Sequence, residues 1–313
     1  MQSQNSVGLD TLLSRLRCPR SRQPLARNGE ALENSDGRYR YPIENGVADL
    51  RVPPERLRVD LAWLEVWDEM DALRFDLPPR LESPDLPYHL DAHLASVPGA
   101  RGDGRWILEI GCGERQCEPY FARRGFHYVG TDADVRGRGP HVLADAHNLP
   151  FADGSFDLYT SMAVYEHLAS PLLAALEAHR VLAPGGTFFG TSAFVYGFHD
   201  RASFNHMTHA ALLWTFRMAG FSDLRIWPDW YYTQSIPEMG FPGKEGWPWR
   251  ASAKAALSML EWSYTRTSNL MRRVVGKRPL DLLARGVEKA GSLSFAARRA
   301  ESAESAPAIP RQG

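Results

Sequence analysis

Residues 106–113 read Trp106-Ile-Leu-Glu-Ile-Gly-Cys-Gly113, a short apolar run that ends in two closely spaced glycines. Such a run predicts a buried strand, and the glycines predict a sharp turn in which the backbone can approach a ligand closely. A fingerprint for a bound pyrophosphate would continue with a third glycine three residues later, but Gln116 stands there. Glu109, two positions before the first glycine, favours a cationic ligand instead.

Apolar runs and helical stretches alternate beyond this turn. Helical periodicity separates five further predicted strands: 128–131, 141–144, 156–160, 186–190 and 224–227. The alternation predicts an α/β fold whose sheet is doubly wound and mostly parallel. Asp132 and Asp145 follow two successive strands, and ligands bind such sheets at the carboxyl ends of the strands. Each aspartate alone is more often a helix cap, but their joint occurrence after the glycine turn favours a binding cleft.

Five motifs in register make residues 104–228 resemble the class I S-adenosylmethionine-dependent methyltransferases. They are Ile107-Leu-Glu-Ile-Gly-Cys-Gly113, Val129-Gly-Thr-Asp132, Ala144-Asp-Ala-His-Asn-Leu-Pro-Phe151 with Asp153-Gly-Ser-Phe-Asp157, Val164-Tyr-Glu-His-Leu168 and Arg180-Val-Leu-Ala-Pro-Gly-Gly186. The resemblance implies a Rossmann-like sheet of seven strands and S-adenosyl-L-methionine as the cofactor. Glu109, Gly111 and Gly113 would line its methionine part, Asp132 would hold the ribose, and Asp145 and Ala146 would meet the adenine. The other cofactor-binding residues that we expect are Cys112, Ala133, His147 and Met162.

The chain departs from the family pattern at two places. Arg115 stands where many members carry another glycine. The connection between Asp132 and Asp145 is too short, and too rich in glycine, for the usual crossover helix. A subset of the family combines this shortening with the same Asp-Ala-His-Asn-Leu-Pro-Phe motif. Many members of that subset modify sugars or other secondary metabolites, so we interpret the shortening as a subfamily feature that leaves cofactor binding intact.

Residues 1–52 are predicted to form a small β-rich lobe. Four of its motifs resemble the zinc-ribbon-like activator proteins of some methyltransferases: Leu16-Arg-Cys-Pro19, Pro24-Leu25, Tyr41-Pro-Ile43 and Gly46-Val-Ala-Asp-Leu50. In that family the first cysteine belongs to a pair, but Ser21 stands at the second position here. Because tetrahedral zinc takes four ligands, Cys18 alone predicts a metal-free remnant kept as a docking element. An unrelated β-lobe is the alternative, and we expect no metal site in the chain.

The remaining regions are assigned by composition. We expect a helical linker at 53–103, a methyltransferase domain at 104–300 and a disordered tail at 301–313. Leu293-Ser-Phe-Ala-Ala297 resembles the family's seventh strand, which inserts antiparallel between the fifth and the sixth. Residues 229–290 would then be a helical insertion over the substrate side of the cleft.

The C-terminal region is basic. Residues 251–300 carry ten Lys or Arg side chains against three acidic ones. A basic amphipathic helix can rest on anionic lipid, so this stretch is compatible with peripheral membrane contact, or it can meet a phosphorylated substrate. A solvated helix face is the more common explanation of such a pattern.

Three histidines are candidates for a catalytic base. A hydroxyl acceptor must lose a proton when it is methylated, and a histidine or carboxylate near the methyl group serves this purpose. His167 follows the fourth strand of the domain, while His199 and His206 follow the fifth, in a loop that faces the acceptor in the family. We rank His199 first and His167 second, although each alone is more often structural.

Composition excludes few classes of function. A net charge of −1 gives no global attraction to nucleic acid, and we expect no nucleic-acid partner. Three cysteines without disulfide spacing and a polar N-terminus predict a cytoplasmic protein. The leading hypothesis is an enzyme of biosynthesis that methylates an oxygen of a small molecule or glycan. The alternatives are a cofactor-binding enzyme of other chemistry and a non-catalytic binding partner, and the oligomeric state is left open.

Overall fold

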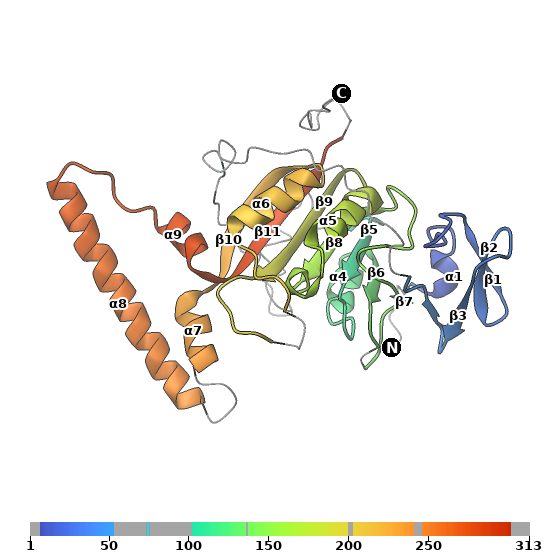
Figure 1. The fold of residues 1–313 in the computed structure, drawn as a ribbon, viewed down its shortest axis with the longest axis horizontal. Coiled ribbons are helices and arrows are strands. Elements are labelled where there is room, and N and C mark those ends of the chain that lie inside the picture. Colours follow the sequence, from blue (N-terminus) through green and yellow to red (C-terminus); the bar gives the residue numbers. More distant parts are fainter. Residues whose placement is uncertain are drawn as a thin grey trace.

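The structure is a computed structural model of the 313-residue chain, drawn in Figure 1. It describes residues 7–52, 73, 75, 102–135, 137–199, 203–240 and 246–301. Within these residues, no helix combines the length and the apolar composition needed to cross a lipid bilayer. The predicted linker and the predicted tail fall almost entirely outside the described residues, so both assignments remain predictions.

A central sheet carries the predicted strands in the predicted order along the chain. Its strands run side by side as β7 (Val142–Leu143), β6 (His127–Asp132), β5 (Trp106–Ile110), β8 (Phe156–Met162), β9 (Leu182–Ala193), β11 (Ala290–Arg299) and β10 (Phe221–Tyr231). Strands β7 to β9 pair in parallel, whereas β11 lies antiparallel between β9 and β10. The predicted insertion of the last strand between the fifth and the sixth is therefore confirmed. Because β6 and β8 flank β5, the winding reverses at β5, which places a ligand cleft at its carboxyl end.

The expected count of seven strands is too low, because the N-terminal lobe extends the same sheet. The lobe begins with α1 (Leu9–Leu12) and continues with β1 (Leu25–Asn28), β2 (Ala31–Asn34), β3 (Arg40–Glu44) and β4 (Val47–Asp49). Strand β4 pairs in parallel with β7, so the described part of the chain forms one sheet of eleven strands. The physical reason is the short connection between β6 and β7, which holds no helix and leaves the edge of β7 open to another strand.

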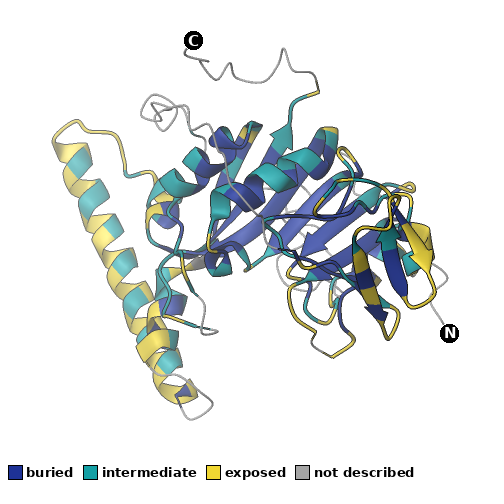
Figure 2. Cartoon of the chain, turned by 45° about the vertical axis from the view of Figure 1, so that its right-hand side comes forward, coloured by how far each residue is buried: buried dark blue, intermediate teal, exposed yellow. Residues whose placement is uncertain are grey.

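The sheet alternates side chains between two apolar layers, as its pleat requires. Ile107, Tyr128 and Leu158 face α4 (Glu118–Arg123), while their neighbours Leu108 and Val129 face the opposite layer. That opposite layer contains α5 (Pro171–Val181) and α6 (His209–Met218). Figure 2 shows the resulting buried interior of the sheet. Alternation with apolar residues on both faces explains why the central strands read as nearly continuous apolar runs.

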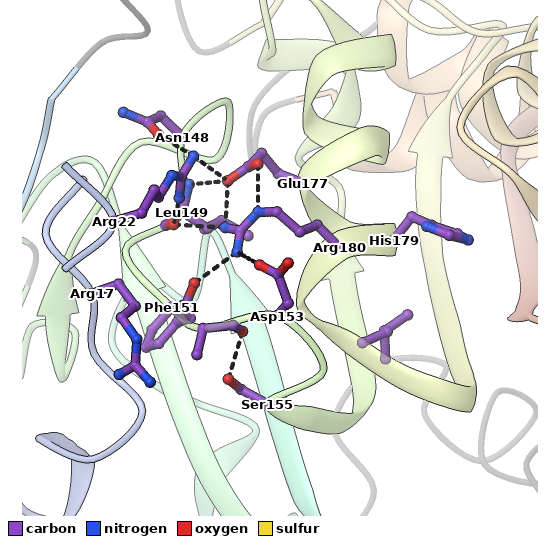
Figure 3. A network of polar contacts seen from close by, with 12 residues as sticks. Arg17, Arg22, Asn148, Leu149, Phe151, Asp153, Ser155, Glu177, His179 and Arg180 are labelled. Atoms are coloured by element: carbon purple, nitrogen blue, oxygen red, sulfur yellow. Dashed lines mark hydrogen bonds and ion pairs between the residues drawn. The ribbon is translucent and has the colours of Figure 1, made fainter. Parts of the chain in front are cut away.

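The lobe is anchored to the segment that follows Asp145, as Figure 3 shows. Arg22 of the lobe donates hydrogen bonds to the carbonyl of Leu149 at 2.9 Å and to Oδ1 of Asn148 at 2.8 Å. From the other side, Arg180 of α5 donates to the carbonyls of Leu149 and Phe151 at 2.9 and 2.7 Å. Two guanidinium groups therefore fix this segment, one from the lobe and one from the sheet's helical layer.

The segment between β10 and β11 is largely helical in the described residues. It contains α7 (Tyr232–Gly240), α8 (Trp247–Val274) and α9 (Leu282–Glu288). In Figure 1, α8 lies at the outer edge of the molecule, at the far end from the N-terminal lobe. None of its residues is buried, so α8 itself is not packed over the sheet.

Candidate active site

The glycine turn after β5 has the geometry that its sequence predicts. Gly111 and Gly113 have φ values of +61° and +50°, in the left-handed region that glycine adopts without strain. A Cβ atom on Gly111 would lie 2.3 Å from Cγ2 of Val164, in the loop after β8. A Cβ atom on Gly113 would meet no atom within 4 Å. The first glycine thus allows close packing, and the second leaves open space beside the backbone.

Asp132, the last residue of the neighbouring strand β6, holds the glycine turn by a hydrogen bond. Its Oδ2 accepts a hydrogen bond from the amide of Gly113 at 2.9 Å, and its Oδ1 accepts one from the amide of Asp134 at 3.0 Å. Cys112, between the two glycines, is buried, and Met162 at the end of β8 is half-buried. Ala133 is exposed, and its carbonyl accepts a hydrogen bond from Arg51 of the lobe at 2.9 Å.

Asp145 is oriented by a histidine that was predicted to bind the cofactor itself. The amide and the ring Nδ1 of His147 lie 2.9 and 2.7 Å from Oδ1 of Asp145. The other ring nitrogen, Nε2, accepts a hydrogen bond from the amide of Ser170 at 3.2 Å. Nδ1 therefore carries the hydrogen and donates a hydrogen bond to the carboxylate of Asp145. Burial alone would raise the pKa of Asp145, but the hydrogen bonds from His147 outweigh it, and the pKa lies below its ordinary value. Ala146, between the two, is half-buried.

Glu109 is the most unusual ionisable group near the turn. Its carboxyl group is buried, and Oε2 accepts a hydrogen bond from the hydroxyl of Tyr128. Burial raises the pKa of Glu109 to about 7, and the nearby charge of Asp132 adds to the effect. Sequence reasoning missed Tyr128, whose only signal was a polar aromatic residue inside an apolar run on the adjacent strand.

Arg115 takes a conformation that explains how it replaces a glycine. Its φ is +58°, and its side chain turns away toward α4 and the β6–β7 connection. Its NH1 lies 2.6 Å from Nε2 of His141 and 3.5 Å from Oε2 of Glu118. Arg138 pairs with the same carboxylate at 2.8 Å. Backbone strain at Arg115 is therefore offset by an ionic network, and the guanidinium is held by groups outside the turn.

The three candidate histidines lie together beyond the carboxyl ends of β8 and β9. The ring centroids of His167 and His199 are 4.9 Å apart, and those of His199 and His206 are 6.0 Å apart. A cavity of about 180 Å³ is lined by two of them, together with residues from the ends of β8, β9, β10 and β11: Ala163, Glu166, His167, Thr191, Ala193, Tyr196, His199, Asp229, Gly291 and Ser292. Ala163 has a φ of +53°, a strained conformation of the kind that gathers at functional sites.

A backbone carbonyl determines which ring nitrogen of His199 carries the hydrogen. Its Nδ1 lies 2.8 Å from the carbonyl of Gly197, which can only accept, so Nδ1 carries the hydrogen. Ser203 also contacts this nitrogen at 3.1 Å and binds the backbone of His199 on both sides. Nε2 therefore has the free electron pair, and it lies 4.0 Å from Oε1 of Glu166.

Glu166 was missed by sequence reasoning, although it stands directly before His167. Its side chain is 1% exposed, and its Oε2 has no hydrogen-bond partner among the residues that the structure describes. Burial raises the pKa of Glu166, while the neighbouring imidazoles act in the opposite direction. One nitrogen or oxygen atom from each of Glu166, His167 and His199 lies within 4.8 Å of the others, a spacing that could also hold a cation.

The middle of the chain is similar to known methyltransferases. Residues 108–190 match the model of a methyltransferase domain family. An uncharacterized methyltransferase of Mycobacterium sp. strain JLS is 40% identical over 92 residues, which are 26% of this chain and 36% of that protein. One from Mycobacterium leprae strain TN is 34% identical over 102 residues, covering 29% of this chain and 38% of the relative. The chain thus spans little more than a third of the length of the curated relatives that it matches.

Several solved structures are also similar to the chain. A complex of the Haloferax volcanii Trm112 methyltransferase activator with a putative methyltransferase is 18% identical, covers 66% of this chain and 87% of that chain, and has a TM-score of 0.43. Phosphoethanolamine N-methyltransferase 2 of Haemonchus contortus, solved with S-adenosyl-L-methionine, is 16% identical over 63% of this chain and 49% of that chain, with a TM-score of 0.38. From the family match and the curated relatives, we conclude that residues 108–190 carry a methyltransferase domain, whose cofactor is S-adenosyl-L-methionine.

Proposed function

We propose that the chain transfers the methyl group of S-adenosyl-L-methionine to an oxygen atom of a small molecule, a sugar or another secondary metabolite. The observation that carries this proposal is the cluster of His167, His199 and His206 at the carboxyl ends of β8 and β9. A hydroxyl group is a weak nucleophile until its proton is removed, and a positioned histidine is the most common base for this purpose. The cluster supports an acceptor that must be deprotonated.

The residues around the glycine turn fit the cofactor. Gly113 leaves open space beside its backbone. Glu109 is a buried carboxyl group whose side-chain hydrogen-bond partners in the described part of the chain, Tyr128 and Cys117, are not cationic. A bound sulfonium ion would supply the missing positive charge, together with the methyl group that is transferred. Asp132 would accept hydrogen bonds from the ribose hydroxyls. Asp145, oriented by His147, would accept one from the adenine amino group.

His199 would act as the base at its Nε2 atom. The hydrogen bond from Nδ1 to the carbonyl of Gly197 leaves Nε2 ready to take the acceptor's proton. The imidazolium that forms would lie 4.0 Å from the carboxyl group of Glu166, whose ionised form stabilises it. Glu166 is thus proposed as a positioning residue that acts through His199. His167 and His206 would complete the acceptor side, with His167 the second candidate for the base.

The flanking regions are proposed to support this site in different ways. The N-terminal lobe would be an activator-like module joined permanently to the enzyme, because its Arg22 fixes the segment after Asp145. Within the insertion, α7 is the part that reaches the acceptor loop. A Cβ atom on Gly197 would lie 3.3 Å from Cγ of Met239 in α7. We therefore assign the role of covering the acceptor side to α7, and not to α8.

The function is tested by incubating purified protein with S-adenosyl-L-methionine labelled in the methyl group and with extracts of its own host. We expect label in a small-molecule or glycan fraction, in a bond that is stable as an ether. An unlabelled extract combined with measurable cofactor binding would contradict methyl transfer. Label on the nitrogen of an amine would contradict the choice of oxygen as the acceptor atom.

Cofactor affinity should depend on pH through Glu109. The folded protein raises the pKa of Glu109 to about 7, so below this pH the group holds a proton that a cationic ligand must displace. Binding should therefore release a proton, and affinity should rise as the pH increases. Between pH 6 and pH 8 we expect a change of roughly tenfold, as for a single group of pKa about 7. Calorimetry in two buffers measures the proton release. Glu109→Gln should abolish the dependence, whereas Glu114→Gln on the same loop should keep it.

The N-terminal lobe should bind no zinc. Cys18 contacts the hydroxyl of Tyr41 at 3.1 Å and the amide of Ser21 at 3.4 Å, so neutral groups surround it. Among the described residues, the one cluster with metal-ligand spacing lies elsewhere, at Glu166. Metal analysis of the purified protein should detect no zinc bound to the lobe. Zinc that remains with the Glu166→Gln variant but leaves the Cys18→Ser variant would contradict this expectation.

A further inference from the structure

Helix α8 presents an apolar surface to solvent over much of its length. Its 28 residues give a helix about 42 Å long, at 1.5 Å per residue. Five large apolar side chains, which we call the outer stripe, are 59% to 75% exposed: Met259, Leu260, Leu270, Met271 and Val274. Exposed apolar patches of this kind mark interaction sites in soluble proteins.

The outer stripe is one continuous face of the helix. At 3.6 residues per turn, its five members fall within a sector of roughly 120°. Within this sector α8 carries no charged residue; its other members are Ala, Ser, Thr and Trp side chains. The opposite face points to the protein, where Glu261 accepts hydrogen bonds from Tyr232 at 2.7 Å and Arg285 at 2.9 Å. The helix is therefore amphipathic, with its charged residues toward the domain and at the edges of the stripe.

The positive charge of the residues around the outer stripe indicates which kind of partner would bind there. Residues 246–280 contain seven Lys or Arg residues and one Glu, a net charge of +6, although the whole chain has a net charge of −1. Five of the seven cluster near the C-terminal end of α8: Arg266, Arg272, Arg273, Lys277 and Arg278. A second copy of this segment, residues 246–280, would bring a net charge of +6 against +6, which is unfavourable. An anionic partner with an apolar interior fits both the charge and the stripe.

Aromatic residues complete the pattern of an interfacial helix. Trp262 is 60% exposed on the flank of α8 between the stripe and the domain, and the guanidinium of Arg266 lies 4.5 Å from its ring centroid. Tryptophan and arginine together are typical of helices that lie in the headgroup layer of a membrane. We propose that α8 docks the protein on an anionic lipid surface, with the outer stripe inserted among the acyl chains and the basic residues on the headgroups.

Binding to vesicles tests this docking with the full-length protein. Wild-type protein should sediment with vesicles of phosphatidylcholine mixed with phosphatidylglycerol, and much less with pure phosphatidylcholine. High salt should weaken the binding, because it screens the headgroup charges. The double variant Leu260→Ser/Leu270→Ser should lower the partition coefficient at least about 100-fold, since two leucines no longer enter the apolar layer. Because α8 has no buried residue, the melting temperature should not change.

A matched pair of charge variants separates lipid binding from other causes. Arg273→Gln/Lys277→Gln should lower the partition coefficient roughly 30-fold, at about 1 kcal/mol for each basic residue. Arg38→Gln/Arg40→Gln removes the same charge from the N-terminal lobe and should bind vesicles like the wild type. Equal losses from both pairs, or no binding of the wild type to anionic vesicles, would overturn the proposal. A wild-type dimer that Leu260→Ser/Leu270→Ser converts to a monomer, without vesicle binding, would assign the stripe to a second copy and also overturn it.

Discussion

Replacing His199 by alanine should lower turnover by roughly 10²–10⁴-fold, the usual contribution of a general base. Its Nε2 is the only ring nitrogen of His199 with a free electron pair, because Nδ1 donates to the carbonyl of Gly197. Cofactor affinity should stay unchanged, since the residues proposed to bind the cofactor lie in or after β5, β6 and β7 and at the end of β8. The measurements are turnover with the native acceptor and calorimetry with S-adenosyl-L-methionine. Added imidazole should restore part of the activity, which a purely structural role would not allow.

Three further variants make this result specific. His127→Ala removes a histidine that stacks on Trp106 far from the cluster, and it should keep normal turnover. His167→Ala should have a smaller effect than His199→Ala; the reverse order would move the base to His167. Glu166→Gln should shift the pH profile of turnover while leaving the Michaelis constant unchanged. Activity that is lost with a chelator and restored by a divalent cation would make these residues metal ligands and would contradict the role of His199.

The strands of the central sheet, and the positions of the candidate residues at their ends, could be predicted from the sequence because they depend on local patterns. Apolar runs indicated where the strands lie. The residue that follows such a run lies at the carboxyl end of the strand, and therefore at one edge of the parallel sheet. Gly111, Asp132 and Asp145 are such residues, and parallel strands must place them at one edge. The histidines follow from the same rule, since His167 and His199 come after adjacent strands β8 and β9.

The features that the sequence did not predict depend on long-range contacts. The pairing of β4 with β7 requires that the outer edge of β7 is not covered by another strand. The residues of β4 do not indicate which strand it will pair with. Glu166 stands beside His167 in the chain, but only the fold buries it and points it at His199. For residues 251–300, composition allowed a solvated helix face or contact with lipid, but only the structure shows which apolar side chains of α8 face solvent.

Replacing Asp132 by alanine should weaken the binding of S-adenosyl-L-methionine by roughly 10²–10⁴-fold. Two charge-assisted hydrogen bonds to the ribose would be lost, each contributing about 1.5–3 kcal/mol. Asp132 also accepts the amide hydrogen bond of Gly113, so part of the effect would arise from a looser glycine turn. Calorimetry measures the total loss, and thermal unfolding without cofactor measures the part that belongs to the turn.

The variant Asp132→Asn separates these two contributions. Its amide oxygen can still accept the hydrogen bond from Gly113, so the glycine turn should keep its shape. The bond from the amide of Asp134 is lost, so the melting temperature should lie between those of Asp132→Ala and the wild type. The variant has lost the negative charge and one of the two acceptor oxygens, so its affinity should lie between those of Asp132→Ala and the wild type. Equal affinity in all three proteins would show that Asp132 does not hold the cofactor, and it would remove the ribose site from this strand end. Weak binding only in Asp132→Ala, matched by an equal loss of stability, would reduce Asp132 to a support for the glycine turn.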